Sequence, residues 1–255
     1  MYKEIITKRF KDEEKIDALN LYKKMMIAYE KDIPMFGNDF YPPNIWKFFE
    51  DEVKIKGLEV HTFGAFNDSE RRMIAFNNIY NTSFPVKVLE IDASSKFSEV
   101  SHRNYLGSIL SLGIERNKIG DLIVKDNICY LAVCEDIADY LVMSIDKIGK
   151  NSCEIKEVTL DVKDINHQFK NEIILIQSMR LDSIVAKLIK KSRSTAQEFI
   201  DEGLVLINYT VNRNKSLELI ENDRVTIRKY GKFIIGKCSG QSKSGKYKIE
   251  IKKYT

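Results

Sequence analysis

Basic side chains recur at helical spacing near the start of the last third of the chain. Arg180, Lys187 and Lys191 are separated by seven and by four residues, which at about 100° per residue places them within roughly 20° of one another on one side of a helix. Grouped lysine and arginine side chains offer point charges and planar forks that bind phosphate oxygens. The spacing therefore indicates a phosphate-binding surface.

A second polar group follows directly along the chain. The run Ser192-Arg193-Ser194 interrupts the first helix, and residues 195–202 are predicted to form a second, short helix. Arg193 would lie where that helix begins, so its guanidinium group and the backbone amides of residues 194–196 can clamp one phosphate together. The other polar members of the group can bond sugar hydroxyls or phosphates, as in recognition of folded RNA by shape: Ser192, Ser194 and Gln197.

The first of these helices needs an apolar side to hold its basic residues in place. Such a side is predicted, because apolar residues fall at i, i+3, i+4, i+7 and i+8: Leu181, Ile184, Val185, Leu188 and Ile189. Ser178 is a candidate N-cap for this helix. Asp182, close to the start, is expected to stabilise the helix N-terminus and to brace a basic neighbour.

Two other runs resemble catalytic motifs. Residues 240–246 (GQSKSGK) have the spacing of a phosphate loop, but Tyr247 stands where a magnesium-binding Ser or Thr is required, and the run is interpreted as a hairpin turn. The triplet Arg180-Leu181-Asp182 is similar to the catalytic aspartate loop of pseudouridine synthases, although here it opens the basic helix itself.

No other residue group suggests a cofactor or a metal. The histidines His61, His102 and His167 are scattered, and the sequence has neither a serine elbow nor a dinucleotide glycine fingerprint. The four cysteines form no C-x-x-C pair with nearby histidines, so neither a disulfide scaffold nor a structural zinc site is expected. We expect no catalytic residues, no metal and no cofactor.

Charge is distributed unevenly along the 255 residues. The whole chain has net charge +4, yet residues 178–255 hold 17 basic and 8 acidic residues, while residues 1–177 hold 24 basic and 29 acidic ones. This asymmetry predicts a polyanionic partner for the last third, either a nucleic acid or a membrane surface. A 44% hydrophobic content fits a globular protein, and no apolar signal or membrane-spanning stretch is evident. A cytoplasmic location without integral membrane association is expected.

Hydrophobic periodicity predicts an α+β protein of three small units. Residues 1–85 are predicted to form two helices (13–29 and 43–54) and a hairpin of strands 60–66 and 72–76. Residues 86–165 follow a β-α-β-β-α-β order that ends with a strand over 153–160, which matches the ferredoxin-like fold of many RNA-recognition modules. This unit lacks their aromatic stacking signature, so base stacking on its sheet is doubtful. After a polar connection around residues 163–171, residues 178–255 contribute two helices and strands at 204–207, 224–229, 232–238 and 247–252.

Residues of this last unit resemble the S-four domain, an RNA-binding module named after a ribosomal protein of the small subunit. The resemblance covers residues 179 to about 228 and rests on an ordered set: Arg180-Leu181-Asp182, Ser192-Arg193-Ser194, Ala196, Ile200, Gly203, Val205, Asn208 and Asn222-Asp223. Asn208 is included among the RNA-binding candidates, although we interpret it first as a turn residue. Upstream, residues 102–124 (HRNYLGSILSLGIERNKIGDLIV) and 64–72 (GAFNDSERR) resemble the YlmH family, with Asn104 and Ala65 as departures.

The YlmH resemblance implies a non-catalytic RNA-binding protein of three parts, acting as a monomer. Its partners would be structured ribosomal or transfer RNA at the large ribosomal subunit, in quality control of stalled peptidyl-transfer RNA. Two alternatives remain open. One is an RNA-modifying enzyme, similar to a pseudouridine synthase, whose chemistry lies in residues 1–160 and whose S-four domain delivers it to RNA. The other is a scaffold for division proteins at the membrane.

Overall fold

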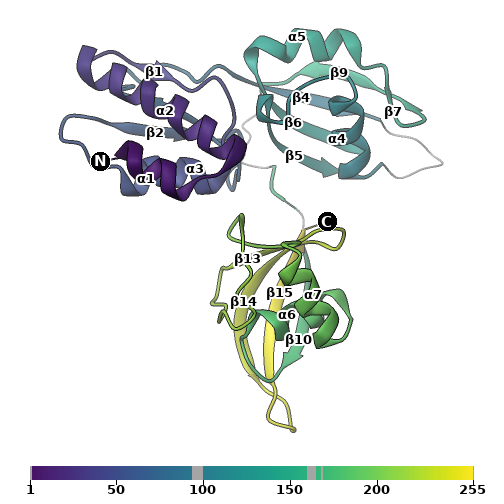
Figure 1. Ribbon diagram of the computed structural model, residues 1–255. Coiled ribbons are helices and arrows are strands. Elements are labelled where there is room, and N and C mark those ends of the chain that lie inside the picture. The colour runs from purple at the N-terminus through teal and green to yellow at the C-terminus, as the bar shows by residue number, and fades with distance from the viewer. Residues whose placement is uncertain (1, 94–99, 160–164, 168, 255) are drawn as a thin grey trace. The chain divides into compact units, whose positions relative to one another are not determined.

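Helices and strands are interspersed along the whole chain in the computed structural model (Figure 1). The structure describes residues 2–93, 100–159, 165–167 and 169–254. The chain folds into two units, Met1–Asn166 and His167–Thr255. Within the described residues, every helix is too short or too polar to cross a membrane.

The first part of unit 1 packs helices and a small sheet around aromatic side chains. Helices α1 (Tyr2–Arg9) and α2 (Asp12–Lys31) precede β1 (Met35–Phe36), α3 (Pro43–Lys47), the π-helical turn η1 (Phe48–Glu52), β2 (Val60–Phe63) and β3 (Met73–Phe76). The strands form an antiparallel sheet in the order β1-β3-β2. Phe48, Phe49 and Phe76 are fully buried in its core.

The sequence predicted most of this part correctly. Helix α2 ends as expected before Pro34, and Asp32 takes the left-handed conformation with φ 51°. The predicted helix over 43–54 is instead a short α-helix followed by one π-helical turn. Helix α1 was not predicted, and both strands of the hairpin are shorter than expected.

The second part of unit 1 has the predicted β-α-β-β-α-β order. Its elements are β4 (Val86–Asp92), α4 (His102–Leu110), β5 (Ile119–Lys125), β6 (Ile128–Cys134), α5 (Glu135–Ser144) and β9 (Glu154–Glu157). The antiparallel sheet has the order β5-β6-β4-β9, as in a ferredoxin-like fold. A short turn η2 (Arg116–Lys118) precedes β5, and β7 (Lys147–Ile148) pairs with β8 (Asn151–Ser152). Leu160, the predicted end of the last strand, lies outside the described residues.

Both faces of this four-stranded sheet are covered near its centre. Leu89 and Leu131 pack against α4 and α5, whereas Ala132, on the opposite face, packs with Phe40 and Phe66 from the first part of the unit. Stacked bases therefore have no open platform at the centre of that face, which supports the doubt raised by its missing aromatic signature.

Unit 2 is a six-stranded antiparallel sheet covered by two helices. Its elements are β10 (Phe169–Ile176), α6 (Leu181–Ile189), α7 (Arg193–Asp201), β11 (Val205–Ile207), β12 (Thr210–Val211), β13 (Arg224–Ile227), β14 (Gly231–Gln241) and β15 (Tyr247–Tyr254). The strand order is β10-β15-β14-β13-β11-β12. The apolar side of α6 is buried against the sheet, as its periodicity predicted.

Strand β10 differs from the sequence prediction. Residues around 163–171 were interpreted as a polar connection, and 160–164 and 168 lie outside the described residues, but Phe169–Ile176 pairs with β15 along eight residues. Ile176 is buried in the core of unit 2. A module that began at residue 178 would therefore leave out one strand of the sheet.

Candidate nucleic-acid interface

The start of α6 is held by a loop and not by a side-chain cap. The amide of Leu181 donates to the carbonyl oxygen of Leu217 at 2.8 Å, and the amide of Asp182 donates to that of Lys215 at 3.2 Å. Arg180 precedes the helix and forms an antiparallel bridge with Glu218. The prediction that Ser178 caps the helix is therefore wrong, because backbone carbonyls from a distant loop accept these bonds.

Asp182 joins three of the predicted RNA-binding residues. Its carboxylate is fully buried and accepts five hydrogen bonds, from Arg180, Arg193 and Gln197. The shortest, from Arg193 Nη2 to Asp182 Oδ2, measures 2.8 Å, and Gln197 Nε2 lies 3.1 Å from the same oxygen. The expectation that Asp182 braces a basic neighbour is confirmed, and it braces residues from both helices.

The pKa of Asp182 reflects this arrangement. Burial raises the pKa, but the hydrogen bonds from Arg180, Arg193 and Gln197, together with the charge of Arg193, outweigh burial and lower the pKa to about 2. The carboxylate is therefore ionised at neutral pH and fully occupied as an acceptor. This occupancy fits a structural group, and it disfavours the similarity of the triplet to a catalytic aspartate loop.

The basic side chains around this carboxylate remain open to solvent. The side chain of Arg193 is 55% exposed and that of Arg180 is 34% exposed. The bonds of Arg193 to Asp182 leave from Nη2, so they do not use Nε or Nη1. Lys187 and Lys191 are also exposed. One carboxylate thus fixes two guanidinium groups and offsets one of their two charges, beside two exposed lysines.

Two details of the predicted phosphate clamp are wrong. Ser192 is the N-cap of α7: its Oγ accepts from the amide of Thr195 at 3.1 Å, and its carbonyl oxygen accepts from the amide of Ala196 at the same distance. These two amides are therefore not available to a phosphate. Ser192 Oγ also contacts Ser194 Oγ at 2.7 Å, and Ser194 is exposed beside it.

Asn208 lies away from this group, in the turn between β11 and β12. It has φ 47°, its amide nitrogen donates to Asp223 Oδ1 at 2.8 Å, and its amide oxygen accepts from the backbone of Arg224 at 2.9 Å. The interpretation as a turn residue is confirmed. Its role in RNA binding stays a prediction, with the side-chain amide already engaged in the protein.

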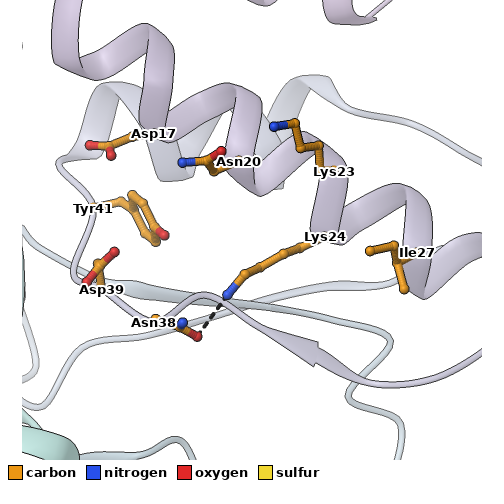
Figure 2. A pocket seen from close by; sticks show the side chains of 8 residues that line it. All are labelled: Asp17, Asn20, Lys23, Lys24, Ile27, Asn38, Asp39 and Tyr41. Atoms are coloured by element: carbon orange, nitrogen blue, oxygen red, sulfur yellow. Dashed lines mark hydrogen bonds between the residues drawn. The ribbon is translucent and has the colours of Figure 1, made fainter.

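A polar pocket lies in the first part of unit 1, where an enzymatic alternative would need its active site (Figure 2). It is lined by residues of α2 and of the segment after β1: Asp17, Asn20, Lys23, Lys24, Ile27, Asn38, Asp39 and Tyr41. Burial, and then the charge of Asp39, raise the pKa of Asp17. Lys24, whose pKa burial lowers, donates to Asn38 Oδ1 and to the carbonyl oxygen of Phe36, both at 2.8 Å.

These groups do not define a reaction. The lysine is already bonded to the protein, and Asp39 forms an ion pair with Lys118 at 3.3 Å. Across the part of the chain that the structure describes, there is also no group of three His, Cys, Asp or Glu side chains that can hold a metal ion. The α6–α7 surface is therefore the stronger candidate site.

Comparisons with known proteins agree with this choice. Residues 80–162 match the family described as "Putative RNA-binding domain in YlmH", and residues 179–225 match the S4 domain. The predicted resemblance to YlmH proteins with a C-terminal S-four domain is confirmed. The S4 match contains α6, α7 and the loop that holds Arg180.

Two individual proteins are similar to this chain. A protein of Bacillus subtilis (strain 168), "Ribosome-associated protein quality control protein P2", is 26% identical over 197 residues, which are 74% of this chain and 76% of that protein. A solved structure, "Cell division protein ylmH from Streptococcus pneumoniae", is 22% identical with a TM-score of 0.48, and the match covers 62% of this chain and 98% of that one.

Proposed function

We propose that this chain, which carries the domain found in YlmH proteins followed by an S4 domain, binds structured RNA through the surface formed by α6 and α7. One observation carries the proposal: a buried carboxylate holds Arg180 and Arg193 side by side, next to exposed Lys187 and Lys191. Guanidinium groups fixed in this way lose little conformational entropy when they bind phosphates.

The arrangement suits the phosphates of a folded RNA better than its base edges. Arg193 can keep its bonds to Asp182 through Nη2 and donate from Nε and Nη1 to one phosphate. Lys187 and Lys191 add point charges without base preference, and Ser194 and Gln197 lie close enough to assist. Recognition would therefore depend on RNA shape and on ionic strength.

We further propose that the bound RNA belongs to the large ribosomal subunit or to a transfer RNA on it, in quality control of stalled peptidyl-transfer RNA. The support is the name of the Bacillus subtilis relative, which associates that protein with the ribosome. In this proposal the protein is not an enzyme, since both matched domains are RNA-binding types. Its action would be to occupy a site on the ribosome.

The decisive experiment removes two of the proposed phosphate contacts, Lys187 and Arg193, by replacing both with Ala. RNA binding should weaken, and the slope of log affinity against log salt should flatten by about 0.7 to 0.9 per lost contact. Binding is measured against purified bacterial ribosomal RNA at several salt concentrations. Co-sedimentation of the same proteins with separated ribosomal subunits tests whether the large subunit is preferred.

A matched control is the double replacement of Lys3 and Lys8 by Ala, which removes the same charge from an exposed face of α1. Its slope should stay close to that of the unchanged protein. If the Lys187→Ala, Arg193→Ala protein is folded and keeps the original affinity and slope, the proposed surface is rejected.

A further inference from the structure

Strands β14 and β15 continue beyond the rest of unit 2 as a two-stranded arm. We call residues 237–248 the hairpin arm; in Figure 1 its tip projects away from α6 and α7. β13 pairs with β14 from Gly231 to Ile234 and no further. All residues of the arm are exposed except Ser242 and Lys246, which are partly buried. The matched S4 residues end at 225, so the arm lies outside that match.

The hairpin arm carries a high density of positive charge. It contains Lys237, Lys243, Lys246 and Lys248, and the chain has no Asp or Glu from residue 225 to residue 249. None of these four lysines takes part in an ion pair among the residues that the structure describes. Like charges on one small arm repel one another, and a polyanion bound there would remove that repulsion.

The turn at the end of the arm has a defined backbone. Ser242 accepts from the amide of Gly245 through its carbonyl oxygen at 2.9 Å, and its Oγ accepts from the amide of Lys246 at 3.1 Å. Gly240 and Gly245 have φ values of 126° and 75°, which side chains with a Cβ rarely adopt. The two lysines of the turn are thus presented on a backbone that is already ordered.

This turn is also the run that had the spacing of a nucleotide phosphate loop. The interpretation as a hairpin turn is confirmed, because strand β15 begins at Tyr247 where a phosphate loop requires a helix. A nucleotide site is therefore not expected here. The lysines of the run point to phosphates of a different origin.

We propose that the hairpin arm is a second RNA-binding element, in which Lys243 and Lys246 contact backbone phosphates along a groove of the same folded RNA that binds α6 and α7. The inference rests on the proposed function and adds a contact that the S4 match does not contain. Charge complementarity supplies the attraction, and lysine point charges tolerate varied phosphate geometry.

Protection of a strand edge and binding to a membrane each account for less of the arm. Lysines on an exposed strand prevent edge-to-edge pairing, which explains Lys237 on β14 but not Lys243 and Lys246 in the turn. A membrane-binding hairpin would need large apolar side chains beside its lysines. Tyr247 is the one large exposed apolar or aromatic residue of the arm, at 38%.

The test replaces Lys243 and Lys246 with Gln in the full chain, with Lys3→Gln, Lys8→Gln as the charge-matched control on α1. The probes are an RNA duplex of roughly 20 base pairs, long enough to span two grooves, and purified bacterial large-subunit ribosomal RNA. The arm variant should bind the ribosomal RNA more weakly, with a salt slope reduced by about 0.7 to 0.9 per lysine. Its circular dichroism and melting temperature should match those of the control.

Combining the arm variant with Lys187→Ala, Arg193→Ala separates this inference from the proposed function. If both surfaces bind one RNA, their losses in log affinity add, because the sites do not share partners. If the helix variant loses affinity and the arm variant binds like the control, the arm inference is overturned and the proposed function stands. The reverse result rejects the helix surface and retains the arm. A loss of binding confined to vesicles of equal phosphatidylserine and phosphatidylcholine would assign the arm to membranes and overturn the inference.

Discussion

At the scale of single residues, Asp182 organises the candidate site without being able to touch RNA itself. Its side chain is fully buried, whereas the arginines that bind it are partly exposed. Removing one partner of such a buried ionic group is costly, because the charge that remains buried loses its compensation. The carboxylate therefore couples the stability of the α6–α7 pair to the geometry of its phosphate-binding side chains.

This coupling predicts a pH dependence of folding. The pKa of Asp182 falls from 3.8 to about 2 on folding, so the group stabilises the folded state above the unfolded-state value, and this contribution is lost as pH falls through the folded-state value. The contribution amounts to about 2 kcal/mol at neutral pH. Denaturant unfolding of the protein and of Asp182→Asn, followed from about pH 6 downward, measures it.

The Asn side chain is nearly isosteric and does not titrate. The difference in unfolding free energy between the two proteins should therefore be largest near neutral pH and shrink in acid. A difference that stays constant across this range would mean that the carboxylate is not held as described.

At the scale of secondary-structure elements, β10 decides where the C-terminal unit begins. It pairs along its whole length with β15, from Phe169↔Tyr254 to Ile176↔Tyr247. Without it, β15 would become an edge strand, and the core would lose Ile176 and the partly buried Ile174. We propose that the RNA-binding module starts at residue 167 and not at residue 178.

Two fragments test this boundary. A fragment of residues 167–255 should unfold cooperatively, whereas one of residues 178–255 should be less stable by several kcal/mol, since it loses a strand and a fully buried isoleucine. Thermal unfolding followed by circular dichroism compares them. Equal melting temperatures would show that β10 adds nothing to the module and would favour the shorter boundary.

At the scale of the whole molecule, charge divides between the two units. Unit 2, residues 167–255, has 18 basic and 9 acidic residues, whereas residues 1–166 have 23 basic and 28 acidic ones. The free face of the four-stranded sheet in unit 1 also carries Glu90, in an ion pair with Lys156 at 2.8 Å. Sequence-independent attraction to RNA phosphates should therefore come from unit 2.

Separate fragments of the two units check this expectation. Residues 167–255 should retain most of the salt dependence of RNA binding by the full chain, and residues 1–166 should bind the same RNA weakly with a shallow slope. Filter binding at several salt concentrations gives both slopes. A steep slope for residues 1–166 would move the main phosphate contacts to the matched YlmH domain.

Local periodicity was sufficient to predict the apolar side of α6, the basic side with Lys187 and Lys191, and the β-α-β-β-α-β order of unit 1. These features depend on neighbours within one or two helical turns or along one strand, and such patterns are visible in a single sequence. The charge asymmetry, which pointed to a polyanion, is likewise a property of the sequence alone.

Only the tertiary structure decided which of these residues meet. Arg193 and Gln197 bind Asp182 from 11 and 15 residues away, β10 pairs with the last strand of the chain, and Phe40 packs on a sheet that begins at residue 86. Each contact joins segments whose local patterns are independent of one another. Their pairing follows from which apolar faces and buried polar groups can be satisfied together, and that is a property of the folded chain.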